Sequence, residues 1–204
     1  MKRIGITGTI ASGKTTVSIL LRRRGLAVFN SDNYAKMALH RGNPCQEKII
    51  AIIGSDVLDE NGDIVPARMA DIIFNEEEKR LAVNAVIHPY VREGMHKFFE
   101  RHAEDMAACA EVPLLFEAGW EEDFDQIILV YCNKETAIQR LMEYRDYSRE
   151  EAIARYESQI DPEIQKTKAD IVFDNSSDLQ ALDQTINRWM RELRKEARDG
   201  SQNT

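Results

Sequence analysis

A short run near the amino terminus has the residue types of a phosphate-binding loop. Residues 8–15 read G-T-I-A-S-G-K-T, which fits the pattern G-x-x-x-x-G-K-[ST]. Glycines let such a loop curl so that successive backbone amides point inward and, with the start of the next helix, form a cradle for phosphates. The lysine brings a point charge to the β- and γ-phosphates, and the hydroxyl residue after it ligates magnesium. The sequence therefore predicts a nucleoside triphosphate site.

The residues on either side of this loop support the interpretation. Residues 3–7 predict a buried strand, and residues 14–25 predict a helix that ends at Gly25. A strand before the loop and a helix after it are the context in which the pattern is meaningful. We expect Thr15 to ligate magnesium and Thr16 to reach the α-phosphate. The residues predicted to hold ATP in this loop are Gly8, Ala11, Ser12, Gly13, Lys14, Thr15 and Thr16.

Two classes of nucleotide-binding protein fit such a loop. A regulatory GTPase would also carry D-x-x-G and N-K-x-D, and the chain has DENG at 59–62 and NKET at 133–136. Thr136 stands where a carboxylate would have to read guanine, and DENG lies in a polar stretch that predicts a turn. We therefore favour the other class, a small-molecule kinase.

A kinase needs a group that orients the acceptor hydroxyl and positive charge that closes over the phosphates. Asp32 ends the second predicted strand, residues 26–32, at the edge where α/β sheets bind ligands. It could orient the acceptor, cap the next helix, or do both. Arg140 and Arg145 lie in a polar, arginine-rich hairpin between two helical stretches, and this composition favours a mobile lid. A sensing module that binds nucleotide or CoA without turnover is the remaining alternative, and intact Lys14 and Asp32 argue against it.

The rest of the chain alternates short apolar strands with helices. Residues 33–106 have a mostly helical period, and we expect Pro89 to interrupt the long helical segment. The alternation predicts an α/β fold with a mainly parallel sheet covered by helices. Residues 199–204 are expected to fray. Further strands are predicted at 110–116, 125–132 and 169–175, and further helices at 134–145, 148–159 and 178–198.

Composition excludes several classes of protein. The chain has 204 residues, enough for one domain with inserted parts, and its formal net charge of −8 argues against a nucleic-acid or membrane-surface binder. No apolar run approaches the roughly 20 residues of a membrane-spanning helix. The three cysteines, Cys45, Cys109 and Cys132, are odd in number and far apart, which predicts free thiols in a reducing compartment. We expect a cytoplasmic protein.

From Ile4 to about Ser177 the chain resembles the dephospho-CoA kinase family. The loop alone is generic, whereas HP at 88–89 and PLLFE at 113–117, together with the late AD…N, are more specific. The pieces that carry the resemblance are GITGTIASGKTTV, NSDNYAK, GDIVPARMADIIF, VIHPYV, VPLLFEAG, QRLM, ARYESQ and KADIVFDN. The chain departs from the family pattern at Asn30, Pro66, Tyr144 and Gln165.

The resemblance implies both an activity and an architecture. The activity is transfer of the ATP γ-phosphoryl group to the ribose 3′-hydroxyl of dephospho-CoA, which gives coenzyme A and ADP as the last step of coenzyme A biosynthesis. The architecture is a three-layer P-loop kinase core of residues 1–32, 107–139 and 166–204. A helical acceptor-binding insertion would occupy residues 33–106, and a small helical lid residues 140–165.

The resemblance also implies roles for particular residues. Asp32 would be the catalytic base or orienting group, and it would act with Lys14 and Arg140. Asn175 would lie near the adenine of ATP. The residues expected on the acceptor side are Asp32, His88, Pro89, Leu115 and Glu117. The implied partners are dephospho-CoA and ATP with magnesium, in a monomer or a weak homo-oligomer without nucleic acid or membrane.

Overall fold

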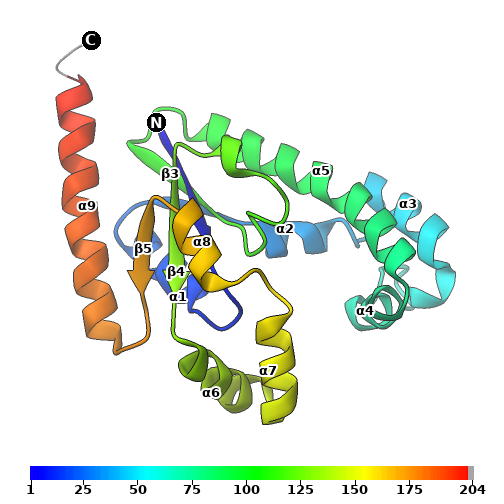
Figure 1. Cartoon of the computed structure of the whole chain (residues 1–204). Helices are drawn as coiled ribbons and strands as arrows, with labels where there is room; N and C mark the ends of the chain where they lie inside the picture. The colour runs from blue at the N-terminus through cyan, green and yellow to red at the C-terminus, as the bar shows by residue number, and fades with distance from the viewer. Residues whose placement is uncertain (202–204) are drawn as a thin grey trace. The chain divides into compact units, whose positions relative to one another are not determined.

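A computed structural model of the chain describes residues 1–201, with side chains through Asp199. Five strands form one sheet in the order β2-β3-β1-β4-β5 (Figure 1). Strand β1 pairs in parallel with β3 and β4, and β4 pairs in parallel with β5. The predicted α/β fold with a parallel sheet is confirmed. The strands are β1 (Lys2–Thr7), β2 (Ala27–Asn30), β3 (Ala107–Glu111), β4 (Gln126–Tyr131) and β5 (Ile171–Asp174).

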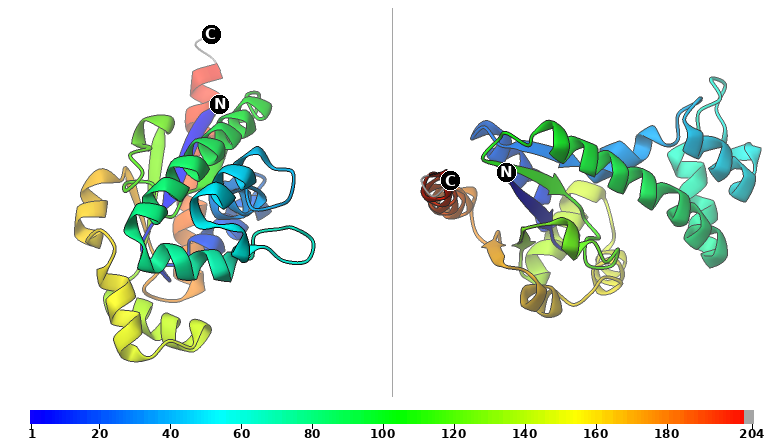
Figure 2. Two further views of the ribbon diagram at one scale, coloured as in Figure 1. Left: turned by 90° about the vertical axis from the view of Figure 1, so that its right-hand side faces the viewer. Right: turned by 90° about the horizontal axis from the view of Figure 1, so that it is seen from above.

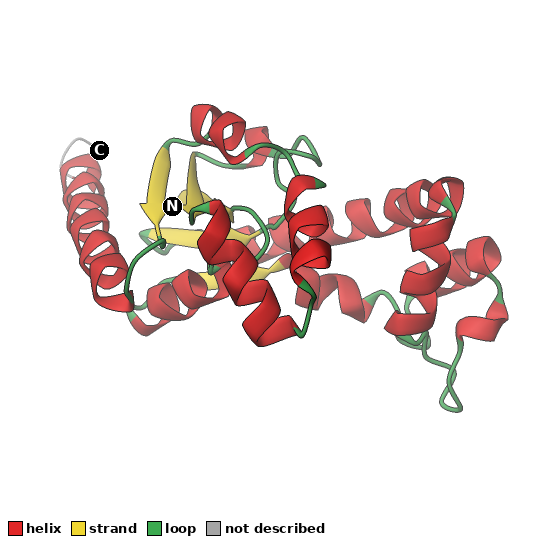
Figure 3. Ribbon diagram, turned by 60° about the horizontal axis from the view of Figure 1, so that its bottom comes forward, coloured by secondary structure: helices red, strands yellow, loops and turns green. Residues whose placement is uncertain are grey.

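Helices connect the strands and make up most of the remaining structure (Figure 3). The last helix continues through Ser201, so the prediction that residues 199–201 fray is wrong. Residues 202–204 lie outside the described part. The α-helices are α1 (Lys14–Arg23), α2 (Ser31–Met37), α3 (Pro44–Ile53), α4 (Pro66–Asn75), α5 (Glu77–Arg101), α6 (Lys134–Arg145), α7 (Arg149–Glu157), α8 (Pro162–Lys168) and α9 (Leu179–Ser201). Two short 3₁₀ helices, η1 (Ser55–Val57) and η2 (Glu121–Asp123), complete the set among the described residues.

The chain divides into two compact units, residues 1–29 with 102–204 and residues 30–101. In the first, the core unit, alternate strand residues such as Ile4 and Ile6 pack against α1 and α9 in one apolar cluster. Helix α9 runs alongside β5 (Figures 1 and 2). The opposite face of β1 is so close to its cover that a side chain at Gly5 would lie 2.8 Å from Leu115 Cδ1. Both faces of the sheet are therefore covered.

The second unit, residues 30–101, consists of helices and one isolated bridge between Leu58 and Ile64. Its apolar core draws on α3, α5 and the segments between them. Asn43 Oδ1 accepts the N–H of Cys45 at 2.9 Å, and Pro44 is the first residue of α3. The predicted turn at 59–63 is also confirmed, with the Asp59 N–H donating to Asp63 O at 2.9 Å. We call this part the helical unit.

Pro89 does not interrupt the long helical segment, so that prediction is wrong. It lies inside α5, which runs unbroken from Glu77 to Arg101. Buried side chains lie on both sides of it, Val83 before and Val91 and Met95 after. A proline inside a helix costs about 3 kcal/mol relative to alanine. Packing of α5 against α2, α3 and α4 outweighs that cost.

The strand predicted at 110–116 is also wrong in its second half. Strand β3 ends at Glu111, and residues 113–119 form turns. The last sheet bond runs from the Val112 N–H to Ile6 O at 2.9 Å. Pro113 follows and has no N–H to continue the ladder, so the chain leaves the sheet there. None of the helices in residues 1–201 is both long enough and apolar enough to cross a membrane.

Candidate active site

The loop between β1 and α1 has the geometry that its two glycines permit. Gly8 and Gly13 both have positive φ angles, 151° and 98°. A Cβ atom at Gly8 would collide with Val130 O, and one at Gly13 would collide with Asn175 Nδ2. Glycine is therefore required at both positions for space as well as for backbone conformation.

The start of α1 leaves its N–H groups open to an anion. The N–H of Val17 bonds back to Gly13 O at 3.1 Å, so those of Thr15 and Thr16 lie in the first turn, where a helix offers them no partner. Gly13 has no side chain to cap the helix, and the first turn carries no acidic residue. This helix end is suited to binding phosphate groups.

Two buried hydroxyls in the same loop also lack partners. Thr9 Oγ1 and Ser12 Oγ belong to the few buried polar atoms of the described side chains that make no hydrogen bond. Thr9 is 2% exposed and Ser12 is fully buried. A buried hydroxyl without a partner is costly, and a phosphate oxygen in the loop could supply the missing acceptor. The residues of the loop thus fit a triphosphate.

The ammonium group of Lys14 lies over its own loop. Lys14 Nζ donates to Gly8 O at 2.8 Å and to Thr9 O at 2.9 Å. A phosphate that entered the loop would offer this ammonium a charged acceptor, which is stronger than a neutral carbonyl. Lys14 is therefore held where it could exchange its backbone partners for a nucleotide.

A carboxylate that the sequence analysis missed lies beside Thr15. Glu111, at the end of β3, is 4% exposed, and its Oε1 accepts the Thr15 hydroxyl at 3.1 Å. Its signal in the sequence is a charged residue inside the apolar run AACAEV. Carboxylate and hydroxyl oxygens are ligands that magnesium accepts, and magnesium usually keeps few protein ligands and completes its shell with phosphates and water. Thr15 and Glu111 fit that chemistry, and the described residues contain no group of three or more acidic, histidine or cysteine side chains that could hold a metal without a substrate.

Arg140 and Asn175 hold the outer side of the loop. Arg140 Nη1 donates to Ala11 O at 3.3 Å and Ser12 O at 3.4 Å, and its Nη2 donates to Asn175 O at 2.9 Å. Asn175, which is buried, donates through Nδ2 to Ser12 O at 2.8 Å. Arg140 and Asn175 therefore both hold the backbone of the loop.

The arginine-rich hairpin has a firmer base than its sequence indicates. Its second helix, α7, begins with a capping box, in which the Glu151 N–H donates to Ser148 Oγ at 3.2 Å. Buried Ile138, Leu141 and Ala152 pack together and against the phosphate loop at Ile10 and Ala11. The sequence does not show this small cluster as an apolar run, because the residues that form it are spread over two helices.

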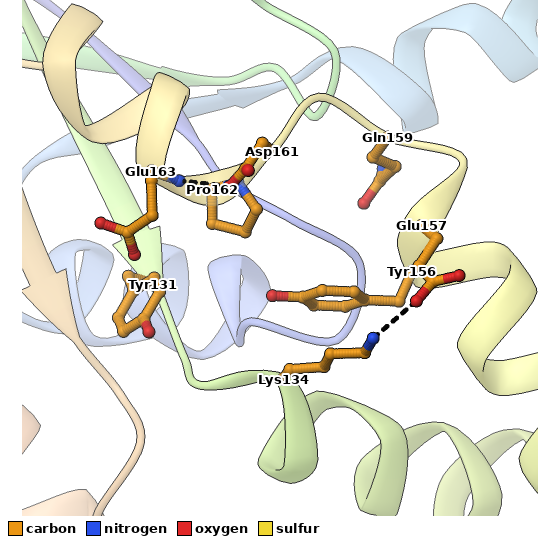
Figure 4. Close-up of a pocket in the computed structure, with 8 residues that line it drawn as sticks. All are labelled: Tyr131, Lys134, Tyr156, Glu157, Gln159, Asp161, Pro162 and Glu163. Carbon is orange, nitrogen blue, oxygen red and sulfur yellow. Dashed lines mark hydrogen bonds and ion pairs between the residues drawn. The ribbon is translucent and has the colours of Figure 1, made fainter.

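A cavity of about 410 Å³ opens next to the base of the hairpin (Figure 4). It lies between the end of β4, the end of α7 and the start of α8. Gln159, on its wall, accepts the backbone N–H of Ile10 through Oε1 at 2.6 Å. The lining residues are Tyr131, Lys134, Tyr156, Glu157, Gln159, Asp161, Pro162 and Glu163.

The two acceptor-side candidates of the PLLFE segment differ in exposure. Leu115 is fully buried and packs against β1 at Gly5, whereas Glu117 is exposed. Leu115 is thus a core side chain.

The other acceptor-side candidates belong to the helical unit. Asp32 is exposed in the first turn of α2, because β2 ends at Asn30. It is not the helix cap: Asn30 Oδ1 accepts the N–H of Asn33 at 2.8 Å. His88 and Pro89 are exposed on α5, and partial desolvation lowers the pKa of His88 below its usual value.

Comparison with known proteins gives consistent results. The family model described as dephospho-CoA kinase matches residues 2–181. The dephospho-CoA kinase of Listeria innocua is 37% identical over 189 residues, which cover 91% of this chain and 94% of that protein. The crystal structure of TT1252 from Thermus thermophilus has a TM-score of 0.81 at 34% identity, covering 94% of this chain and 97% of that one. The dephospho-CoA kinase from Campylobacter jejuni has a TM-score of 0.74 at 26% identity, covering 95% and 98%.

Proposed function

Because the chain belongs to the dephospho-CoA kinase family, we propose that its phosphate loop, Glu111 and Asp32 divide the work of one phosphoryl transfer. The reaction is ATP-dependent phosphorylation of dephospho-CoA in coenzyme A biosynthesis. The observation that carries the assignment of roles is the loop itself, where a helix end, two buried hydroxyls and a lysine converge. Phosphoryl transfer requires mainly positioning and charge compensation, which these groups supply.

The core unit binds the triphosphate. The loop amides and the hydroxyls of Thr9 and Ser12 donate to phosphate oxygens, and Lys14 leaves its two backbone carbonyls to contact the β- and γ-phosphates. Thr15 and Glu111 would hold magnesium, which supplies positive charge to the phosphate oxygens. Asn175 lies near the adenine, and Arg140 steadies the outer side of the loop. Support comes from the bonds of Arg140 and Asn175 to Ser12 O.

The helical unit binds the acceptor substrate. Asp32 accepts a hydrogen bond from the ribose 3′-hydroxyl and takes its proton late, as a bond forms between that oxygen and the γ-phosphorus. The bond from the γ-phosphorus to the oxygen it shares with the β-phosphate breaks, and ADP leaves with that electron pair. His88 and Pro89 line the acceptor side, and Glu117, which we also assign to the acceptor, belongs to the core unit. Support for Asp32 is its exposed carboxylate two residues after the end of β2.

The hairpin of α6 and α7 would close over the phosphates and exclude water, which is the competing acceptor. We assign this role to residues 140–165, and the acceptor-binding role to residues 33–106. The exposed tip supports the first assignment, since Tyr144 is 70% exposed and Arg145 is exposed beside it.

We place the reaction in the cytoplasm, as the three buried free thiols, Cys45, Cys109 and Cys132, are compatible with a reducing compartment. Burial raises the pKa of Cys109 to about 12, so this thiol is inert at neutral pH. A monomer or weak homo-oligomer remains our prediction, and analytical ultracentrifugation would measure it.

A panel of acceptors tests the proposed function. ADP release is followed with dephospho-CoA, adenosine, AMP and phosphopantetheine, each at the same concentration with ATP and magnesium. We expect turnover with dephospho-CoA to exceed that with the fragments, because the fragments lack binding energy that positions the hydroxyl. Turnover confined to an acceptor other than dephospho-CoA would refute the proposal.

A further inference from the structure

One residue of the phosphate loop has a backbone conformation that needs an outside restraint. Ala11 has a φ angle of 58°, in the left-handed region that residues with a side chain rarely adopt. Such a conformation persists only where the surrounding structure imposes it. The contacts around Ala11 should therefore reveal which residues determine the shape of the loop.

The restraint comes from two directions. On the carbonyl side, Arg140 donates to Ala11 O at 3.3 Å, and Cys132 Sγ lies 3.9 Å from the same oxygen. On the amide side, the N–H of the preceding residue, Ile10, donates to Gln159 Oε1 at 2.6 Å. Gln159 comes from the segment between α7 and α8, 149 residues further along the chain. The turn at Ala11 is thus held on both sides by residues that the motif does not contain.

Gln159 also determines which amides face a nucleotide. The N–H of Ile10 is occupied by the Gln159 carboxamide and does not enter the cradle. The open donors are then those that follow, at the start of α1. The backbone that carries this side chain is held in turn, because Gln159 lies two residues after the end of α7 and its N–H lies 3.5 Å from Tyr156 O. In Figure 4, Gln159 and Tyr156 lie on the same wall of the cavity.

We propose that Gln159 is a positioning residue for ATP. It acts through the backbone amide of Ile10. The inference rests on the proposed function only in taking the loop as the ATP site. Gln159 touches no reacting atom. It keeps Ile10 and Ala11 in the conformation in which the later loop amides are presented to the phosphates.

Three substitutions separate the hydrogen bond from simple packing. Gln159→Met keeps the length of the side chain and removes the acceptor. Gln159→Asn keeps the carboxamide and shortens its reach by one methylene. Gln159→Glu keeps an acceptor oxygen at the original reach. Ser158→Ala is the matched control, because Ser158 is the exposed neighbour and its hydroxyl donates to Arg155 O within its own helix turn.

The measurement is binding of a non-hydrolysable ATP analogue by calorimetry, together with the amide signal of Ile10 by NMR. We expect the dissociation constant to rise about three- to tenfold in Gln159→Met and Gln159→Asn, the usual range for one lost hydrogen bond. The Ile10 amide proton should shift upfield and exchange faster in both. In Gln159→Glu that amide signal should stay close to wild type. Ser158→Ala should match wild type in both measurements.

Two results would overturn the proposal. One is a folded Gln159→Met protein whose affinity for the analogue lies within 1.5-fold of wild type. The other is an equal loss of affinity for the analogue and for dephospho-CoA together with a lower melting temperature, which would indicate a general structural role. A wild-type protein that binds the analogue but does not phosphorylate dephospho-CoA would refute the proposed function and leave this inference intact.

Discussion

Lys14 and Gly13 are neighbours in the loop but contribute by different physical means. Lys14 brings charge, and its ammonium group is already within 2.9 Å of the loop carbonyls Gly8 O and Thr9 O. Gly13 brings space, since any side chain there would meet Asn175. Substitutions at the two positions should therefore have different signatures.

Lys14→Ala should lower the turnover number by on the order of 10²-fold or more, because a charge that stabilises the transferring group is lost. The protein should remain folded, since the Lys14 side chain is partly exposed. Steady-state kinetics at saturating ATP, with circular dichroism on the same sample, measures both. Near wild-type turnover would mean that the loop is not the catalytic cradle.

Gly13→Ala should weaken ATP binding by about tenfold or more, because the new methyl group must displace Asn175, which bonds to Ser12 O. Gly25→Ala is a matched control. Gly25 also has a positive φ angle, 89°, but nothing lies within 4 Å of its missing side chain. Both variants carry backbone strain of roughly 1–2 kcal/mol. Calorimetry should find ATP affinity reduced only in Gly13→Ala, and equal affinities in the two variants would contradict the steric argument.

The residues that the sequence reveals are those whose chemistry is local. The loop is recognisable because its glycines, lysine and threonine are contiguous. Glu111 was missed because its partner Thr15 is 96 residues away and only the strand order brings the two together. Gln159 belongs to a quoted motif, but its bond to Ile10 spans 149 residues and leaves no pattern in the sequence.

At the scale of elements, prediction succeeded where periodicity or a cap is explicit. Helix α6 has the predicted bounds, and the capping box of α7 is present. Two of the errors involve proline. A helix break was predicted at Pro89 because the packing that stabilises α5 around this proline cannot be inferred from the local sequence. A strand was predicted through Pro113 because the apolar run PLLF resembles a strand. Burial decided the first case, and the missing N–H decided the second.

The hairpin of α6 and α7 should move at its tip and remain fixed at its base. The cluster of Ile138, Leu141 and Ala152 anchors the base to the loop at Ile10 and Ala11. Hydrogen exchange followed by mass spectrometry should show slow exchange around Ile138 and Leu141 without substrate, and fast exchange at 144–148. Addition of an ATP analogue and dephospho-CoA should protect 144–148. Fast exchange throughout 138–156 in the free protein would refute an anchored base.

At the scale of the molecule, the division into two units matters most for function. The residues proposed to hold ATP lie in the core unit, and Asp32, His88 and Pro89 lie in the helical unit. The sequence indicated a helical block at 33–106, but it could not define the compact unit at 30–101, because that depends on contacts between helices far apart in the chain. A change in one unit should then affect one substrate or the chemistry, and spare binding of the other substrate.

Asp32→Asn tests this division most directly. The change keeps size and shape but removes the negative charge and most of the basicity. The proposed ATP site lies in the core unit, so the affinity for ATP should stay within a few-fold of wild type. Turnover should fall by about 10²–10⁴-fold, the usual contribution of a general base, because the lost interaction strengthens only as the hydroxyl proton leaves.

The decisive measurement is the turnover number and the ATP dissociation constant on one folded sample of Asp32→Asn. Asp56→Asn, the same change at another exposed aspartate of the helical unit, in η1, is the control and should match wild type in both. The account predicts normal ATP binding with turnover reduced by at least about 10²-fold. An Asp32→Asn protein that binds ATP normally and turns over within about threefold of wild type, far below the general-base range, would contradict it.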